Sequence, residues 1–181
     1  MRKLVEEGKL IKLNKRYYEN RDYQGEENDF YYLEAFASKG VVCLLSAARY
    51  YLLTTYIPDA IDVAIPRKNK VSSLPKLPKL KVHYFTEHRY CLGKTLIKEG
   101  RNSFYIYDKV RTVVDIVFYR NKVGIEETKE VLLNYLRSKD KNLNKLLEYA
   151  KKMKCDNILR EYLEVLLYKA NIFHLFLIEA I

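Results

Sequence analysis

Two kinds of residue in this chain could carry chemistry, a large excess of basic side chains and a few carboxylates. The sequence of 181 residues holds 33 lysines and arginines against 23 aspartates and glutamates, a formal net charge of +10. Such an excess favours association with polyanions, including nucleic acids. Lysine outnumbers arginine, which suits point-charge contact with phosphates better than bidentate recognition of bases. The composition therefore directs attention first to a basic surface.

The basic residues concentrate in three places. One lies near the N-terminus, one fills a loop broken by prolines that contains no carboxylate, and one runs through the C-terminal helices. For the second and third groups, a solvated face that binds nothing is the alternative interpretation. The predicted nucleic-acid-binding residues are Lys9, Lys12, Lys15, Arg16, Arg67, Lys68, Lys70, Lys141, Lys145, Lys151 and Lys152.

The carboxylates suggest a different chemistry. Asp115, with Asp62 or Glu126, could hold a divalent metal in an enzyme that processes nucleic acid. The sequence has no phosphate-binding loop, dinucleotide-binding, zinc-protease or esterase motif. Asp115 also lies one helical turn after Arg111, a spacing that predicts a structural ion pair. We predict no catalytic residue, no metal site and no cofactor, and we keep the metal-dependent enzyme as the alternative.

The first 24 residues have the order of elements found at the back of a winged helix-turn-helix. Arg2–Glu7 is predicted to be the end of a helix closed by Gly8, and Lys9–Leu13 alternates as a strand. A basic turn and an aromatic strand at Tyr17–Tyr18 follow. A recognition helix and its wing are connected in this way.

The remaining residues predict an α+β body. A polar linker precedes it, and its later half is helical. We predict two domains, 1–24 as a partial winged helix-turn-helix and 25–181 as the body, in which a small mixed sheet is flanked by helices. The predicted strands cover residues 61–65, 81–85, 95–98 and 104–107, and the predicted helices cover 30–37, 41–52, 108–120, 126–136, 142–153 and 157–167.

The cysteines and the apolar segments indicate where the protein is located and which partners it could have. Cys43, Cys91 and Cys155 are odd in number and far apart, which argues against a disulfide framework and favours a reducing cytoplasm. We expect Cys43 and Cys155 to be buried thiols. No segment reaches the roughly 20 apolar residues that span a bilayer. The apolar end, Ala170–Ile181, is expected to dock on the body or to pair two copies as a homodimer.

Three segments together resemble the AbiEi family, the antitoxins and transcriptional regulators of type IV toxin–antitoxin systems that abort phage infection. They are SKGVVCLLSAARYYLLTTYIPDAIDVAIPRKNK, YDKVRTVVDIVFYRNKVGIEETKEVLLNYLR and NLNKLLEYAKKMKCDNILREYLEVLL. The most specific part is the motif Arg111-Thr112-Val113-Val114-Asp115, which opens a helix after an aromatic strand. Within this motif, Arg111, Thr112 and Asp115 are candidates for a structural or functional role.

The resemblance implies a cytoplasmic, non-enzymatic protein with two parts. An N-terminal winged helix-turn-helix binds promoter DNA, and a C-terminal domain counteracts a nucleotidyltransferase-type toxin without requiring a stable complex with it. The partners it implies are that toxin, and promoter DNA or the RNA substrate of the toxin. Compared with the family, this chain starts inside the recognition helix, so we expect transcriptional autoregulation to be impaired.

Overall fold

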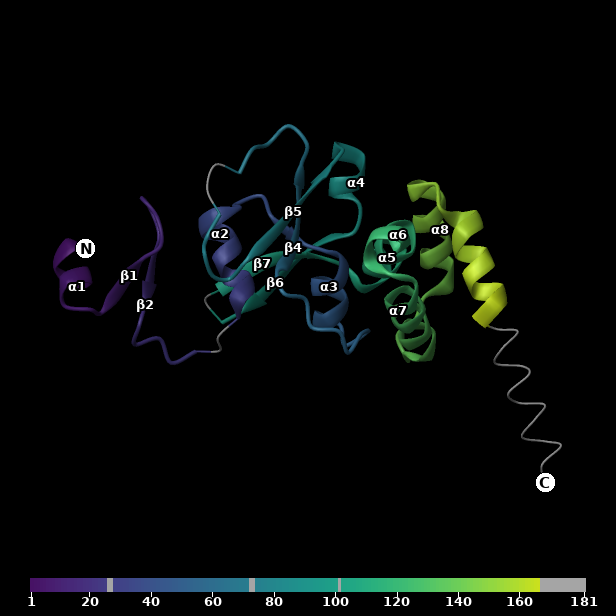
Figure 1. Ribbon diagram of the computed structural model, residues 1–181, viewed down its shortest axis with the longest axis horizontal. Helices are drawn as coiled ribbons and strands as arrows, with labels where there is room; N and C mark the ends of the chain where they lie inside the picture. Colours follow the sequence, from purple (N-terminus) through teal and green to yellow (C-terminus); the bar gives the residue numbers. More distant parts are fainter. Residues whose placement is uncertain (26–27, 72–73, 101, 167–181) are drawn as a thin grey trace, which may run out of the picture. The chain divides into compact units, whose positions relative to one another are not determined.

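The computed structural model of the chain describes residues 1–25, 28–71, 74–100 and 102–166. Within these residues it is a mixed α and β protein with one five-stranded sheet and a separate two-stranded sheet (Figure 1), which confirms the predicted α+β class. Mutual contacts divide the chain into two compact units. The first unit comprises residues 1–42 and 58–107, and the second comprises residues 43–57 and those from 108 onward.

The N-terminal ribbon agrees with its prediction. Helix α1 (Arg2–Glu6) ends where Gly8 takes a positive φ of 72°, a conformation that costs glycine nothing and other residues about 1 kcal/mol or more. Strands β1 (Leu10–Lys12) and β2 (Tyr18–Asn20) then pair antiparallel, with Ile11 opposite Glu19. The segment 1–24 lies wholly in the first unit, and the domain boundary expected after it stays a prediction.

The five-stranded sheet forms the core of the first unit. Its strands are β3 (Val41–Val42), β4 (Ile61–Pro66), β5 (Leu80–Phe85), β6 (Lys94–Glu99) and β7 (Asn102–Tyr107). They stand in the order β5-β4-β3-β7-β6, parallel at β4–β5 and β3–β7 and antiparallel at β3–β4 and β6–β7. The four predicted strands are confirmed as β4, β5, β6 and β7, each extended by a residue or more.

Short helices pack on this sheet. The 3-10 helix η1 (Asp29–Tyr31) and α2 (Tyr32–Phe36) occupy the predicted helical segment, and the Phe30 ring meets Phe104 of β7 edge to face at 5.2 Å. A helix that the sequence analysis did not predict, α4 (Glu87–Cys91), follows β5. Its Tyr90 hydroxyl donates to the carbonyl of Lys39 at 2.8 Å, which fixes α4 against the body of the unit.

The predicted helix 41–52 is wrong at both ends. Val41 and Val42 form the central strand β3, and helix α3 covers only Leu44–Tyr50. Both valines are fully buried and pair with β4 and β7, so two β-branched residues complete the sheet instead of starting a helix. Leu52, the last residue of the predicted helix, is 80% exposed and has a left-handed backbone conformation, because the helix has already ended.

The second unit is helical. Besides α3 it contains α5 (Lys109–Phe118), α6 (Arg120–Val123), α7 (Ile125–Arg137), α8 (Leu143–Met153) and a helix over 156–166. Helix α5 packs against α3, α7 and α8. Cys43 and Cys155 are buried as expected. The apolar end, Ala170–Ile181, lies outside the described residues. Within the described part of the chain, no helix is long and apolar enough to cross a membrane.

Helix α5 is buried on every side. All residues from Val110 to Val117 are inaccessible or nearly so. A helix enclosed in this way must satisfy its polar side chains inside the protein. Thr112 does so by donating its hydroxyl to the Asp108 carbonyl at 3.0 Å. Arg111 does so through Asp115, one turn later.

Asp108 joins α5 to α8. Its Oδ1 accepts a hydrogen bond from the Arg111 backbone N–H at 2.8 Å and so caps α5. Its Oδ2 accepts from Lys145 Nζ at 2.9 Å and from the Tyr149 hydroxyl at 3.2 Å. The hydrogen bond to Asp108 raises the pKa of the Lys145 ammonium above its usual value. One carboxylate therefore fixes both the start of α5 and the position of α8.

We expect Asp108→Ala to lower the free energy of unfolding by about 2 kcal/mol, because it removes an N-cap and the partner of Lys145. Asp108→Asn should restore the part of this free energy that comes from capping, since asparagine caps a helix equally well. Chemical denaturation monitored by circular dichroism measures both. Asp140→Ala is the control, because that carboxylate bonds Lys109 from an exposed position and should matter much less. Equal destabilisation by Asp108→Ala and Asp140→Ala would contradict the joining role.

Glu130 of α7 holds the segment that follows α3. Its carboxylate accepts hydrogen bonds from the Thr54 hydroxyl at 2.6 Å and from the Thr55 N–H and hydroxyl at 2.9 Å. The bond from Thr54, then that from the Thr55 backbone, lower the pKa of Glu130 below its usual value. The contribution of a lowered carboxyl pKa to stability is present above the unfolded-state pKa and disappears as pH falls through the folded-state pKa.

Glu130→Gln should therefore destabilise the protein by an amount on the order of 1 kcal/mol at neutral pH. The difference in the free energy of unfolding between variant and wild type should persist down to about pH 5. It should shrink as the pH falls below about 4, because the wild-type carboxylate then loses its charge. Denaturant titrations at a series of pH values measure this difference. The exposed Glu164→Gln is the control and should show no such trend. A difference that is independent of pH would contradict the role of the Glu130 charge.

Candidate nucleic-acid interface

The wing turn, residues 13–17 between β1 and β2, is built around one asparagine. Asn14 Oδ1 accepts from the backbone N–H groups of Arg16 at 2.9 Å and Tyr17 at 3.0 Å, which closes an Asx-type turn. Asn14 Nδ2 donates to the carbonyl of Ala35 in α2 at 2.6 Å. The turn is therefore held by α2, and the side chains that it carries start from a fixed backbone.

The cations of the wing point into solvent. Lys12, Lys15 and Arg16 are exposed, and no carboxylate of the described residues forms an ion pair with them. Lys9 Nζ lies 3.2 Å from Glu7 Oε2, so part of its charge is already neutralised within the ribbon. Three unneutralised cations on a rigid turn can contact phosphates, and lysines in such a position contribute affinity without reading sequence.

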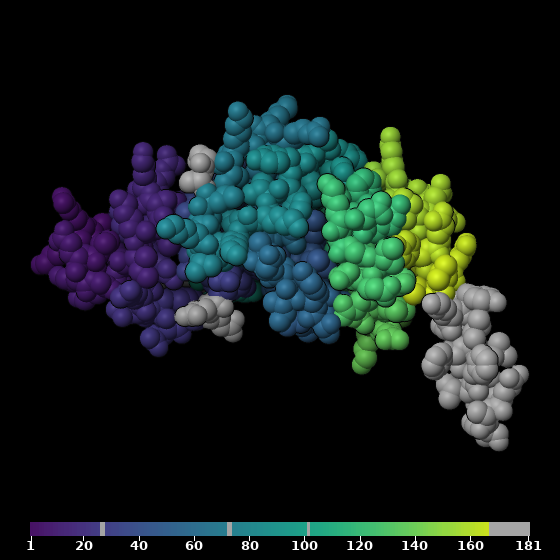
Figure 2. Space-filling view, viewed as in Figure 1, coloured from purple at the N-terminus to yellow at the C-terminus, as the bar shows by residue number. Residues whose placement is uncertain are grey.

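The second group lies in the basic loop, residues 67–79, that connects the parallel strands β4 and β5. Arg67, Lys68 and Lys70 are exposed, and Lys76 and Lys79 follow in the same loop. The start of the loop is fixed, because the Arg67 N–H donates to the Phe85 carbonyl at 2.8 Å and the Asn69 N–H to the Pro66 carbonyl at 2.9 Å. Long side chains project from this part of the surface (Figure 2). The loop contains no acidic residue.

The third group of basic residues, in the second unit, is partly neutralised by neighbouring carboxylates. Lys145 is bound to Asp108, and Lys152 Nζ lies 2.6 Å from Glu148 Oε1. Lys141 and Lys151 are exposed. Neutralisation by neighbouring carboxylates weakens Lys145 and Lys152 as phosphate ligands, and their part in binding stays a prediction. The wing and the basic loop of the first unit are the stronger candidates.

The motif residues are structural in position. Arg111 and Asp115 are completely buried, with Arg111 Nη2 3.0 Å from Asp115 Oδ1, which confirms the predicted ion pair. Thr112 is equally buried. None of these three side chains reaches the surface, so the motif positions α5 and does not itself contact a macromolecule.

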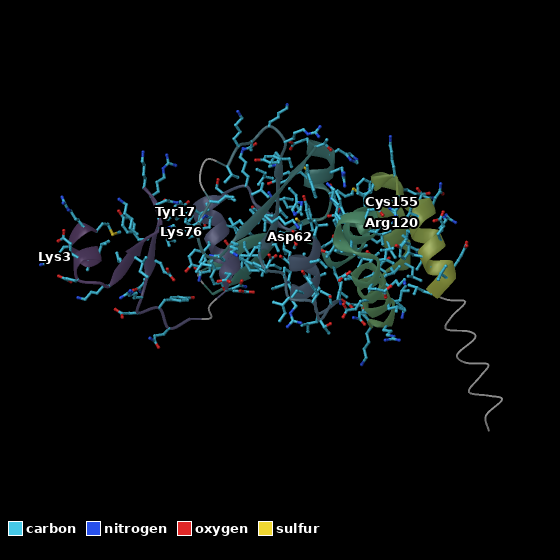
Figure 3. The ribbon with its side chains drawn as sticks, viewed as in Figure 1. Lys3, Tyr17, Asp62, Lys76, Arg120 and Cys155 are labelled. Atoms are coloured by element: carbon cyan, nitrogen blue, oxygen red, sulfur yellow. The ribbon has the colours of Figure 1, made fainter. Side chains whose placement is uncertain are left out.

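The carboxylates of the alternative enzyme hypothesis have other partners. Asp62 lies in the sheet (Figure 3), where its Oδ1 is 2.8 Å from His83 Nε2 of the neighbouring strand. Glu126 is exposed and pairs with Lys129 at 2.7 Å, whereas Asp115 is buried against Arg111. Among the described residues no group of three or more histidine, cysteine, aspartate or glutamate side chains could hold a metal ion. These positions favour structural roles, and the absence of catalysis stays a prediction.

One surface feature was missed by the sequence analysis. On strands β6 and β7, Lys94 and Tyr105 share one face of the sheet, with Lys94 Nζ 3.9 Å from the centre of the Tyr105 ring. Tyr105 is 38% exposed, and the exposed Lys98 lies on the same face. An accessible ring beside lysines can stack a base while the lysines meet phosphates. The signal was the alternation of Lys94, Leu96 and Lys98 along a predicted strand.

No family model matches this chain, and no curated protein matches it. The resemblance to the AbiEi family therefore rests on the segments quoted above and stays a prediction. The same holds for the nucleic-acid partner.

The triple variant Arg67→Gln/Lys68→Gln/Lys70→Gln should weaken binding to duplex DNA or RNA and flatten its dependence on salt, by roughly 0.9 in the logarithmic slope for each phosphate that is no longer neutralised. Fluorescence anisotropy with a labelled oligonucleotide at several salt concentrations measures both quantities. The matched control is Lys3→Gln/Lys109→Gln/Lys129→Gln, which removes the same charge from lysines already paired with carboxylates. If the two triple variants bind alike, net charge alone is responsible and the basic loop is not a site.

Proposed function

We propose that this protein is an antitoxin of a type IV toxin–antitoxin system, related to the AbiEi family, that counteracts a nucleotidyltransferase-type toxin. The observation that supports this most directly is the setting of the Arg111–Asp115 motif. It occupies the start of α5, immediately after the aromatic strand β7, and it is buried as the centre of the helical unit. The most specific part of the resemblance therefore coincides with the residues on which the packing of that unit depends.

The surface suggests how such a protein would act. The wing and the basic loop present exposed cations. Cations of this kind bind phosphates, so the group contacted would be the RNA or nucleotide substrate of the toxin, or DNA, and not an acidic patch buried in a stable toxin complex. In this proposal the toxin is a functional partner through the substrate that the two proteins share.

The two basic surfaces divide the proposed tasks. The β1–β2 ribbon would contact DNA through the exposed Lys12, Lys15 and Arg16, which suit phosphates and not base edges. The basic loop of the body would carry the antitoxin activity.

Growth assays during co-expression with the nucleotidyltransferase-type toxin encoded beside it test this proposal. We expect the wild-type chain to restore growth, Lys12→Gln/Lys15→Gln/Arg16→Gln to restore it equally, and Arg67→Gln/Lys68→Gln/Lys70→Gln to reduce viable counts by at least about tenfold. Circular dichroism and expression levels establish that every variant is folded and present. Failure of the folded wild-type chain to restore growth would overturn the proposal.

A further inference from the structure

The first unit contains a cavity lined by tyrosines. Its volume is about 400 Å³, and its walls come from the β1–β2 ribbon, the linker, η1, α2 and the start of β7. This size lies in the range of ligand sites in proteins, roughly 300–1,000 Å³. Tyr17, the last residue of the wing turn, belongs to this wall (Figure 3). The aromatic wall consists of Tyr17, Tyr18, Tyr23, Tyr31 and Tyr32.

Hydrogen bonds from separate segments fix this wall. The Tyr32 hydroxyl of α2 donates to Glu19 Oε1 of β2 at 2.7 Å, and the Tyr31 hydroxyl donates to Glu99 Oε2 of β6 at 2.5 Å. Asn102 Nδ2 donates to the Tyr23 hydroxyl at 3.0 Å. The rings of Tyr23, Tyr31 and Tyr32 are thus held by their hydroxyl groups, so that a ligand would meet three rings that are already in place.

The charge of the cavity is opposite to that of the protein. Three carboxylates line it, Glu19, Asp29 and Glu34, and none of its described lining residues is a lysine or an arginine. Because the chain has a formal net charge of +10, a cavity lined by carboxylates differs in charge from what its overall composition would give. It repels a phosphate and attracts a cation. The tyrosine rings add to this attraction, because the face of an aromatic ring is negative.

We propose that this cavity binds a small organic cation with an ammonium or guanidinium group. The rings would contact the apolar part and the face of the cationic group, and the carboxylates at Asp29 and Glu34 would neutralise the charge. The same chemistry is offered by a free amine or by a lysine or arginine side chain of another protein. The proposal is independent of the antitoxin function and of the basic surfaces.

Nuclear magnetic resonance titration of the folded chain with agmatine tests this inference. We expect saturable shifts that centre on the residues of the cavity wall. Asp29→Asn/Glu34→Gln should weaken binding by about threefold to thirtyfold, and so should Tyr17→Leu, since a cation–π contact or an ion pair contributes that much. Both carboxylates are exposed, so the double variant leaves the hydrogen bonds of the wall in place. The double variant carries the test if Tyr17→Leu does not fold.

Two further ligands show whether the occupant is a free amine or a protein side chain, and whether the cavity prefers a cation to a neutral aromatic molecule. A capped Gly-Arg-Gly peptide that binds more tightly than agmatine would identify a protein side chain as the occupant, and the reverse would identify a free amine. Adenosine is the neutral aromatic control. Glu161→Gln, an exposed carboxylate of the second unit, is the control for net charge and should leave agmatine binding unchanged. Tighter binding of adenosine than of both cations, or agmatine binding that is insensitive to Asp29→Asn/Glu34→Gln, would overturn the proposal.

Discussion

The enclosure of helix α5 is the constraint on which the helical half of the protein depends. A helix with no exposed side has to neutralise every polar group that it carries, and α5 carries a buried arginine and a buried aspartate. Placing them one turn apart brings the two charges together within a single helix. Removing one partner of such a pair typically costs about 3–5 kcal/mol, whereas replacing both by apolar residues can be neutral. The packing of α5 therefore explains why the Arg111–Asp115 motif carries its two charges one turn apart.

The packing of the helical unit also separates the basic residues into those that it uses and those that it does not. Lys145 is tied to Asp108 at the start of α5, and Lys109 bonds Asp140, so some of the positive charge serves the helical unit itself. The cations of the wing and of the basic loop have no such task. Exposed like charges repel one another and add nothing to the fold. Their concentration on two backbone-anchored turns is easier to understand as a surface for polyanions than as a requirement of folding.

What the sequence predicted followed from local patterns, and what it missed depended on distant partners. The strands at 61–66 and 102–107 and the wing turn all carry their signals within a few residues. Strand β3 does not, because two valines before an alanine-rich segment favour a helix until β4 and β7 are placed on either side. The basic candidates could be identified, but not which of them would be neutralised. The tyrosine cavity could not be predicted, since its wall joins residues from 17 to 102.

The ribbon places two opposite electrostatic surfaces close together in sequence. Lys15 and Arg16 stand in the wing turn, and Tyr17 and Glu19, directly after them, line the cavity. The exposed cations of the turn attract phosphates and repel ammonium groups, whereas the carboxylates and ring faces of the cavity do the opposite. One short ribbon therefore presents two surfaces that differ in the sign of the charge they would accept.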